Sequence, residues 1–182
     1  MKTVHVFTVL ALAAAGFAVD AISAANDAQS AYKRVSEQAG ESYKVARARC
    51  DVLTGNPKEI CVAEAKAARV YQEANAKASL KNNVDAVTDA RKAIADADHE
   101  VETARCGALT GNPKDVCMKA AKANLVATLA DAKADKKVIQ AREDANEDKR
   151  SADYKVALEK CDAFAGETNK ACVANVKTQF GK

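Results

Sequence analysis

The segment "CDVLTGNPKEIC" at residues 50–61 returns almost unchanged as "CGALTGNPKDVC" at residues 106–117, and a fainter copy, "CDAFAGETNKAC", occupies residues 161–172. The first cysteines of successive copies are 56 and 55 residues apart. The match extends further, because the fifth residue before each first cysteine is valine and the fifth after each second cysteine is lysine. We therefore expect a single helical domain, residues 26–182, with three internal repeats at about 28–82, 83–137 and 138–182.

Each copy carries the signals of a tight turn between two helices. Glycine adopts a left-handed backbone without steric cost, and we expect it to end the preceding helix. In the first two copies, asparagine follows as the expected N-cap and proline as the expected first helical residue. The third copy lacks the proline, and Thr168 is its expected cap. The predicted turn-forming residues are Gly55, Asn56, Pro57, Gly111, Asn112, Pro113 and Gly166.

Two cysteines flank each predicted turn at similar distances, on helices that run in opposite directions. A bridge between them would staple a helical hairpin. Ten residues separate the cysteines of each pair, whereas zinc and redox sites favour much shorter spacings. We therefore predict three structural disulfides, Cys50–Cys61, Cys106–Cys117 and Cys161–Cys172.

The segments between the cysteine pairs favour long helices. Residues 62–105 and 118–160 contain neither proline nor glycine and are rich in Ala, Lys, Glu, Asp and Arg. Val87, Ile94 and Val101 recur every seven residues, and an alanine follows three residues after each, which is typical of a close-packed antiparallel helix pair. The expected helices span about 27–54, 57–109, 113–164 and 168–180. A break at Asn82-Asn83 or at Lys136-Lys137 is the alternative.

These elements predict an all-α fold of elongated antiparallel helical hairpins stapled by three disulfides. The first and last helices are expected beside the same end of the long central hairpin. That end would be a partial four-helix bundle, and the other end would be a two-helix coiled-coil stalk.

The amino terminus has the order of a secretory signal. A basic residue, Lys2, precedes an apolar run, and small residues at 23–25 offer a cleavage site after Ala24 or Ala25. We expect residues 1–25 to be a signal peptide and the mature chain not to insert stably into a membrane. A retained anchor is the competing interpretation, because the apolar run approaches transmembrane length.

Residues that could carry chemistry are few. No nucleotide-binding, hydrolase or metalloprotease motif occurs. His99 stands where the other copies have Tyr43 and Tyr154, which favours a packing position over a catalytic base. The acidic clusters at 96–100 and 143–148 fan around a helix, so a solvated face is expected. We predict no catalytic, cofactor-binding or metal-ligating residue. Interspersed charges and a net charge of +3 do not favour nucleic acid as a partner.

The turns "LTGNPKEIC" and "LTGNPKDVC" resemble those of a family of small secreted Ala/Lys-rich proteins of Gram-negative bacteria, some labelled TolA-like. Members repeat a Cys-x-x-Leu-x-Gly-Asn-x-Lys-Asp-x-Cys turn. The third copy departs from it at Glu167-Thr168-Asn169. The resemblance implies a periplasmic location and supplies no catalytic residues.

The favoured function is a non-enzymatic periplasmic scaffold, spacer or interaction protein whose partners are other envelope proteins. A soluble periplasmic binder of metal or another small ligand, using acidic helix faces, is the alternative. An enzyme is the third. The oligomeric state stays open at this point.

Overall fold

The structure, a computed structural model, describes residues 17–182 and gives side chains from residue 26 onward. The predicted signal peptide, residues 1–25, therefore falls mostly outside the described residues. Over the described part, the chain is all-α, as predicted. Its elements are α1 (Phe17–Arg49), a 3-10 turn η1 (Cys50–Val52), α2 (Gly55–Lys81), α3 (Val84–Cys106), α4 (Gly111–Cys161) and α5 (Gly166–Phe180).

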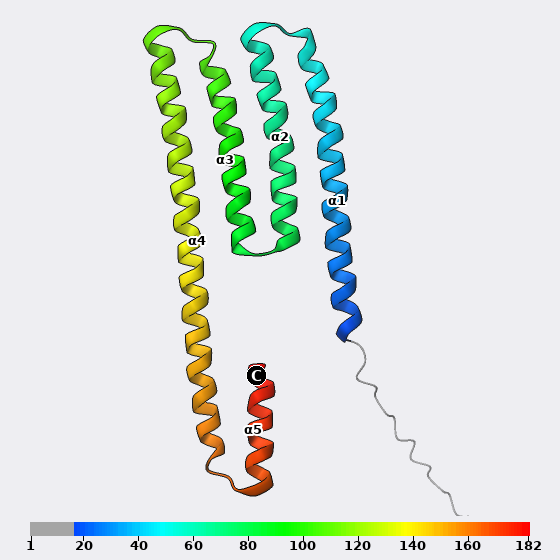
Figure 1. The fold of residues 1–182 in the computed structure, drawn as a ribbon, viewed down its shortest axis with the longest axis vertical. Helices are drawn as coiled ribbons and strands as arrows, with labels where there is room; N and C mark the ends of the chain where they lie inside the picture. The colour runs from blue at the N-terminus through cyan, green and yellow to red at the C-terminus, as the bar shows by residue number, and fades with distance from the viewer. Residues whose placement is uncertain (1–16) are drawn as a thin grey trace, which may run out of the picture.

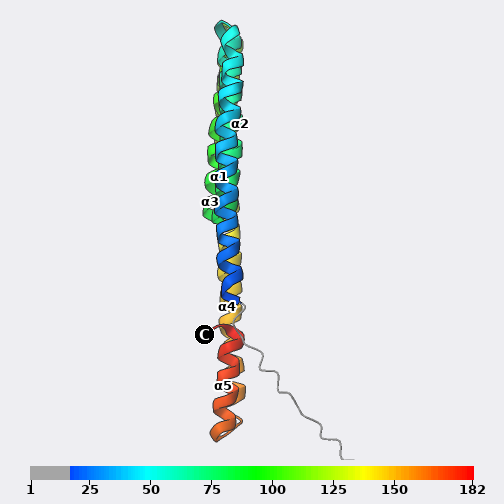
Figure 2. The same ribbon diagram turned by 90° about the vertical axis from the view of Figure 1, so that its right-hand side faces the viewer.

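The helices lie side by side in a single layer (Figure 1). α1 contacts α2, α2 contacts α3, and α3 contacts α4, while α5 packs beside the carboxyl-terminal half of α4. Within residues 17–182, helices that are not consecutive in the chain have no Cα atoms within 8 Å of each other. Seen from the side, the molecule is one helix thick (Figure 2). Antiparallel helical hairpins are thus confirmed, arranged as an elongated row.

The expected four-helix bundle with a two-helix stalk is wrong. α2 and α3 each bury alanines on two opposite sides of the helix instead of on one side. Ala65 and Ala67 of α2 are both buried, although two residues of separation place them about 200° apart around a helix. Ala95 and Ala97 of α3 repeat this arrangement. A helix with two opposed seams takes one neighbour on each side, which extends a row and does not close a bundle.

The helix expected at 57–109 is also wrong, because it breaks at Asn82-Asn83 into α2 and α3. Asn82 adopts a left-handed conformation with φ 44°, and its backbone N–H donates to the Ala78 oxygen at 2.8 Å. The Asn83 side chain caps α3 by accepting from the Ala86 N–H at 2.8 Å. Asparagine suits both roles, since its short amide tolerates φ above zero and bonds to the backbone.

The alternative break at Lys136-Lys137 does not occur, because α4 runs for 51 residues without interruption. Neither lysine offers the left-handed tolerance or the capping oxygen of asparagine. Two ion pairs also hold α3 against this stretch, Arg91–Asp135 at 2.6 Å and Asp85–Lys136. At 1.5 Å per residue, α4 is about 75 Å long.

The turns differ in detail from the expectation. α1 ends at Arg49 and not near residue 54, because η1 and the extended residues Leu53 and Thr54 intervene. Gly55 is left-handed as expected (φ 61°), but it opens α2 and does not close α1. Gly111 (φ 59°) and Gly166 (φ 60°) do the same for α4 and α5.

The predicted asparagine caps are wrong for the same reason. The residues at the N-cap positions are Thr54, Thr110 and Ala165, all extended and none with a side-chain capping hydrogen bond. Asn56 and Asn112 lie within the first turn, together with Pro57 and Pro113. In the third copy, Thr168 likewise lies inside α5.

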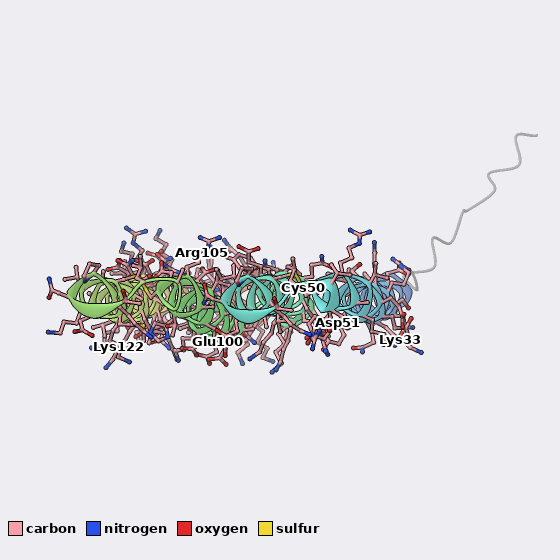
Figure 3. All side chains as sticks on the ribbon, turned by 90° about the horizontal axis from the view of Figure 1, so that it is seen from above. Lys33, Cys50, Asp51, Glu100, Arg105 and Lys122 are labelled. Carbon is pink, nitrogen blue, oxygen red and sulfur yellow. A yellow bond between two sulfur atoms is a disulfide. The ribbon has the colours of Figure 1, made fainter. Side chains whose placement is uncertain are left out.

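The buried core is thin and consists largely of alanine. Its central cluster joins Ala67 of α2 with Ala97 and Val101 of α3. Polar side chains project from both broad faces of the row when it is seen along the helices, with Arg105 on one face and Glu100 and Lys122 on the other (Figure 3). Over the described residues, none of the helices combines the length and the apolar character needed to cross a membrane.

Candidate functional site

Each of the three turns is closed by a disulfide with the pairing expected from the sequence. Cys50–Cys61, Cys106–Cys117 and Cys161–Cys172 each have Cα atoms 5.6 Å apart. The first cysteine of each pair is completely buried. Each bridge closes a loop of about a dozen residues, for which the chain-entropy model gives a contribution of roughly 3 kcal/mol. Among residues 17–182, no cysteine is free.

The first turn also contacts the carboxyl end of α3. The Asn56 side-chain amide donates to the main-chain oxygen of Ala104 at 2.7 Å. This approach requires glycine at position 107, because an added Cβ would lie 2.5 Å from Asn56 Nδ2. The sequence reasoning missed this role of Gly107. The available signal was that the other copies place Asp51 and Asp162 directly after the first cysteine.

Three polar contacts reinforce the interface between α2 and α3. Lys66 pairs with Glu100 at 2.6 Å, and Arg105 with Glu64 at 2.8 Å. The Tyr71 hydroxyl donates to the carboxylate of Asp98 at 2.8–2.9 Å. That hydrogen bond, together with partial burial and the nearby negative charge, raises the pKa of Tyr71 above its usual value. These contacts are exposed, so they set the register of the two helices more than they add stability.

His99 occupies a repeated packing position, as its counterparts Tyr43 and Tyr154 suggested. Each faces the next helix of its own hairpin. Arg69 of α2 lies over the Tyr43 ring at 5.7 Å, and the Tyr154 and Phe180 rings pack at 5.5 Å. His99 is half-buried and lines a small cavity of about 90 Å³ with Leu125 of α4.

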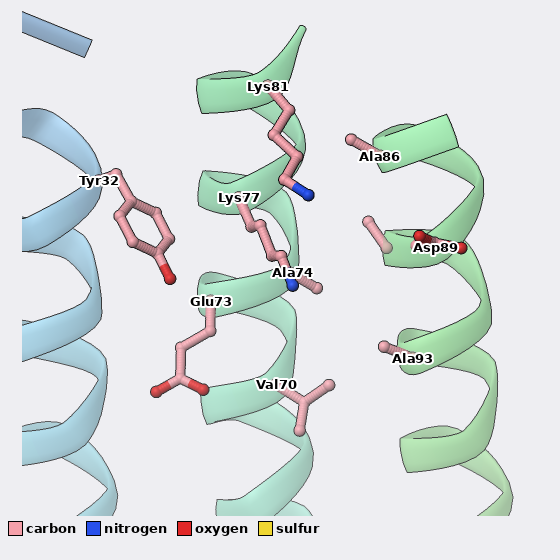
Figure 4. A pocket seen from close by; sticks show the side chains of 10 residues that line it. Tyr32, Val70, Glu73, Ala74, Lys77, Lys81, Ala86, Asp89 and Ala93 are labelled. Atoms are coloured by element: carbon pink, nitrogen blue, oxygen red, sulfur yellow. The ribbon is translucent and has the colours of Figure 1, made fainter. Parts of the chain in front are cut away.

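A concave feature with both polar and apolar lining lies between α1, α2 and α3, near the Asn82-Asn83 turn (Figure 4). Its volume is about 300 Å³. Alanines and Val70 form its apolar part, and Tyr32 closes it from the α1 side. Lys77 and Lys81 reach into it from α2, opposite Asp89 of α3. Glu73 also lines it, so two basic and two acidic side chains surround the apolar part of the cavity.

The acidic clusters keep their carboxylates apart in the described residues. Within the described part of the chain, no three His, Cys, Asp or Glu side chains converge on one point. In the 96–100 cluster, Asp98 is bound to Tyr71 and Glu100 to Lys66, so the two carboxylates are engaged separately.

Comparisons with protein-family models, with curated proteins and with solved structures gave no match to this chain. Function is therefore inferred from the geometry of the row and its stapled turns.

Proposed function

We propose that this protein is a non-enzymatic helical scaffold or spacer of the Gram-negative periplasm that keeps other envelope proteins at a fixed separation. The observation that supports this role is the single-layer row, in which one 51-residue helix joins hairpins that are each closed by a disulfide. Disulfides persist in oxidising compartments, and the amino-terminal pattern is typical of an export signal.

A row of this kind exposes two broad faces and long edges to partners. Charged side chains of both signs cover the faces (Figure 3), while valines such as Val45 and Val87 are about half exposed among them (54% and 46%). Such a surface suits contact with proteins at several points along the row.

The test is photo-crosslinking in intact Gram-negative cells, with a photoreactive amino acid at Val45 or Val87 of the full chain. We expect adducts of discrete mass with envelope proteins, and a periplasmic fraction that contains the oxidised chain. A Cys50→Ser/Cys61→Ser variant, whose first hairpin is not stapled, should lose the Val45 adducts. Retention of a reduced chain in the cytoplasm, or no adduct at either position, would contradict the proposal.

The second candidate function, binding of a small ligand, is favoured by the cavity between α1, α2 and α3. Its lysines and its apolar wall suit an acidic amphiphile such as a medium-chain fatty acid. Calorimetry with decanoate as the probe tests this candidate. Saturable binding that Lys77→Glu/Lys81→Glu abolishes would support it, and absence of heat above the probe's own dilution would exclude it.

A further inference from the structure

One side of α4 is exposed along nearly its whole length. α3 and α5 both lie on its other side (Figure 1). The free side carries a line of small and branched residues, here called the α4 stripe, whose members are three or four positions apart except where Asp148 separates Ala145 from Ala152. In the amino-terminal half its members are Ala123, Ala127, Ala130 and Ala134. Val138 lies at the centre, and the carboxyl-terminal half adds Ala141, Ala145, Ala152 and Val156. All of these residues are exposed.

Several of these positions are covered where α2 packs on α3. In the internal repeat, the amino-terminal half of α4 corresponds to α2, and the carboxyl-terminal half of α4 corresponds to α3. Ala123 therefore corresponds to Ala67, and Val156 corresponds to Val101. Ala67 and Val101 are 7% and 8% exposed where α2 packs on α3, whereas Val156 is 54% exposed.

The straight course of α4 explains this difference. Asn82-Asn83 folds α3 back onto α2, so the two seams meet within the chain. The corresponding residues between the second and third copies continue the helix. α4 therefore carries both surfaces that pack together between α2 and α3, and within one straight helix these two surfaces cannot meet.

On the outer edge of α1, the surface that corresponds to the α3 surface packed on α2 stays in solvent. α1 in the first repeat corresponds to α3 in the second. The buried Ala86, Ala90 and Ala97 of α3 correspond in α1 to Ser30, Arg34 and Glu41, all exposed. At the same positions α4 keeps alanine, at 141, 145 and 152. A polar outer face is what a terminal repeat needs for solubility. The α4 stripe lacks such polar replacements at these three positions.

We infer that the α4 stripe is covered by the α4 stripe of a second copy of this chain, packed antiparallel about a two-fold axis near Val138. In this arrangement the amino-terminal half of each α4 meets the carboxyl-terminal half of the other. The contact between α2 and α3 is thereby repeated twice, and a row of hairpins continues from one copy into the next. The two-fold axis makes the interface isologous and closed.

Charge favours the antiparallel direction. Residues 111–137 carry six basic and three acidic side chains, and residues 138–161 carry five basic and six acidic ones. Antiparallel packing places the basic half of each α4 against the acidic half of its partner. One pair is unfavourable, because Lys66 and Glu100 of the α2 and α3 contact correspond to Lys122 and Lys155. This inference rests on the repeat geometry and does not depend on the proposed envelope role.

Sedimentation equilibrium of the oxidised full chain tests the inference. We expect a dimer for the wild type, a monomer for Val138→Asp, and a dimer for the control Val87→Asp, which changes a similarly exposed valine of α3 (50% and 46%). Lys155→Glu should restore an ion pair with Lys122 of the other copy. The two-fold axis forms this pair twice, so the dimer Kd should fall by roughly tenfold. A wild-type chain that stays monomeric at ~0.5 mM, about 10 mg/mL for a small protein, would overturn the inference, as would equal masses for the two Asp variants.

A photoreactive residue at Val126 locates the contact. Val126 corresponds to Val70, which packs against the cluster of Ala67, Ala97 and Val101. The predicted adduct joins it to residues 151–156, which lie about 40 Å away along the same α4 and are therefore reached only in the second copy. An adduct confined to other segments would overturn the antiparallel register.

Discussion

The side-chain amide of Asn56 donates a hydrogen bond to the main-chain oxygen of Ala104, 2.7 Å away and 48 residues later in the chain. Gly107 leaves the space for it. This contact joins the first stapled turn to the end of α3, so the first and second hairpins are connected at the turn as well as along their helices.

Gly107→Ala should lower the free energy of unfolding by about 1–2 kcal/mol, because the added Cβ displaces the Asn56 amide from its acceptor. Gly40→Ala in α1 is the matched control. No atom lies within 4 Å of a Cβ added there, so alanine should raise stability by about 0.5–1 kcal/mol. Denaturant unfolding of the oxidised variants measures both values. If Asn56→Ala leaves the cost of Gly107→Ala unchanged, the two residues are not coupled.

The sequence predicts the local features of this fold well. The repeated Gly and Cys positions predicted the turns and the disulfide pairing, since both depend on residues close together in the chain, whereas the caps expected at Asn56 and Asn112 were wrong. The order of the helices in space was not predictable in the same way. The alanines at 90, 97 and 104 indicated one seam, and the opposite seam through Ala95 was overlooked because alanine occurs all around these helices.

The break between α2 and α3 could have been chosen over a continuous helix from the same sequence. Asn82 and Asn83 supply a left-handed residue and a cap in succession, and no such pair occurs at Lys136-Lys137. The role of Gly107 was hidden for a different reason. Its partner Asn56 is distant in sequence, and only packing of the two hairpins brings them together.

Asn83→Ala should destabilise the chain by about 1 kcal/mol through loss of the cap on α3. Asn83→Asp, which keeps an accepting oxygen, should cost much less. Asn75→Ala, an exposed change within α2, is expected to raise stability by a few tenths of a kcal/mol. Thermal unfolding compares the three variants. Equal effects of Ala and Asp at position 83 would show that the cap contributes nothing.

His99→Tyr should leave stability unchanged or slightly higher, because the first and third copies already carry tyrosine at this position. His99→Asp should be destabilising, since it adds a negative charge beside Asp98 and Glu102 at the half-buried contact with Leu125. Melting temperatures of the two oxidised variants measure both effects. A large loss for Tyr combined with tolerance of Asp would contradict the packing role.

Tyr71 should titrate above the usual range, because its pKa is raised by the hydrogen bond to Asp98. Since the folded pKa is the higher one, the contribution of this pair to stability is complete below pH ~10 and is lost as the pH rises through the folded value. Ultraviolet titration of Asp98→Asn should show Tyr71 ionising at lower pH than in the wild type. Asp96→Asn is the control and should leave the curve in place. Identical curves for wild type and Asp98→Asn would exclude the interaction.

Small-angle scattering of the oxidised monomer, separated by chromatography, tests the single-layer row most directly. A rod as long as α4 alone has a radius of gyration of about 22 Å at 1.5 Å per residue, and we expect at least that value with a maximum dimension above 75 Å, or ~1.5 Å × 51. A radius near the ~16 Å of a compact domain of this length would contradict the row.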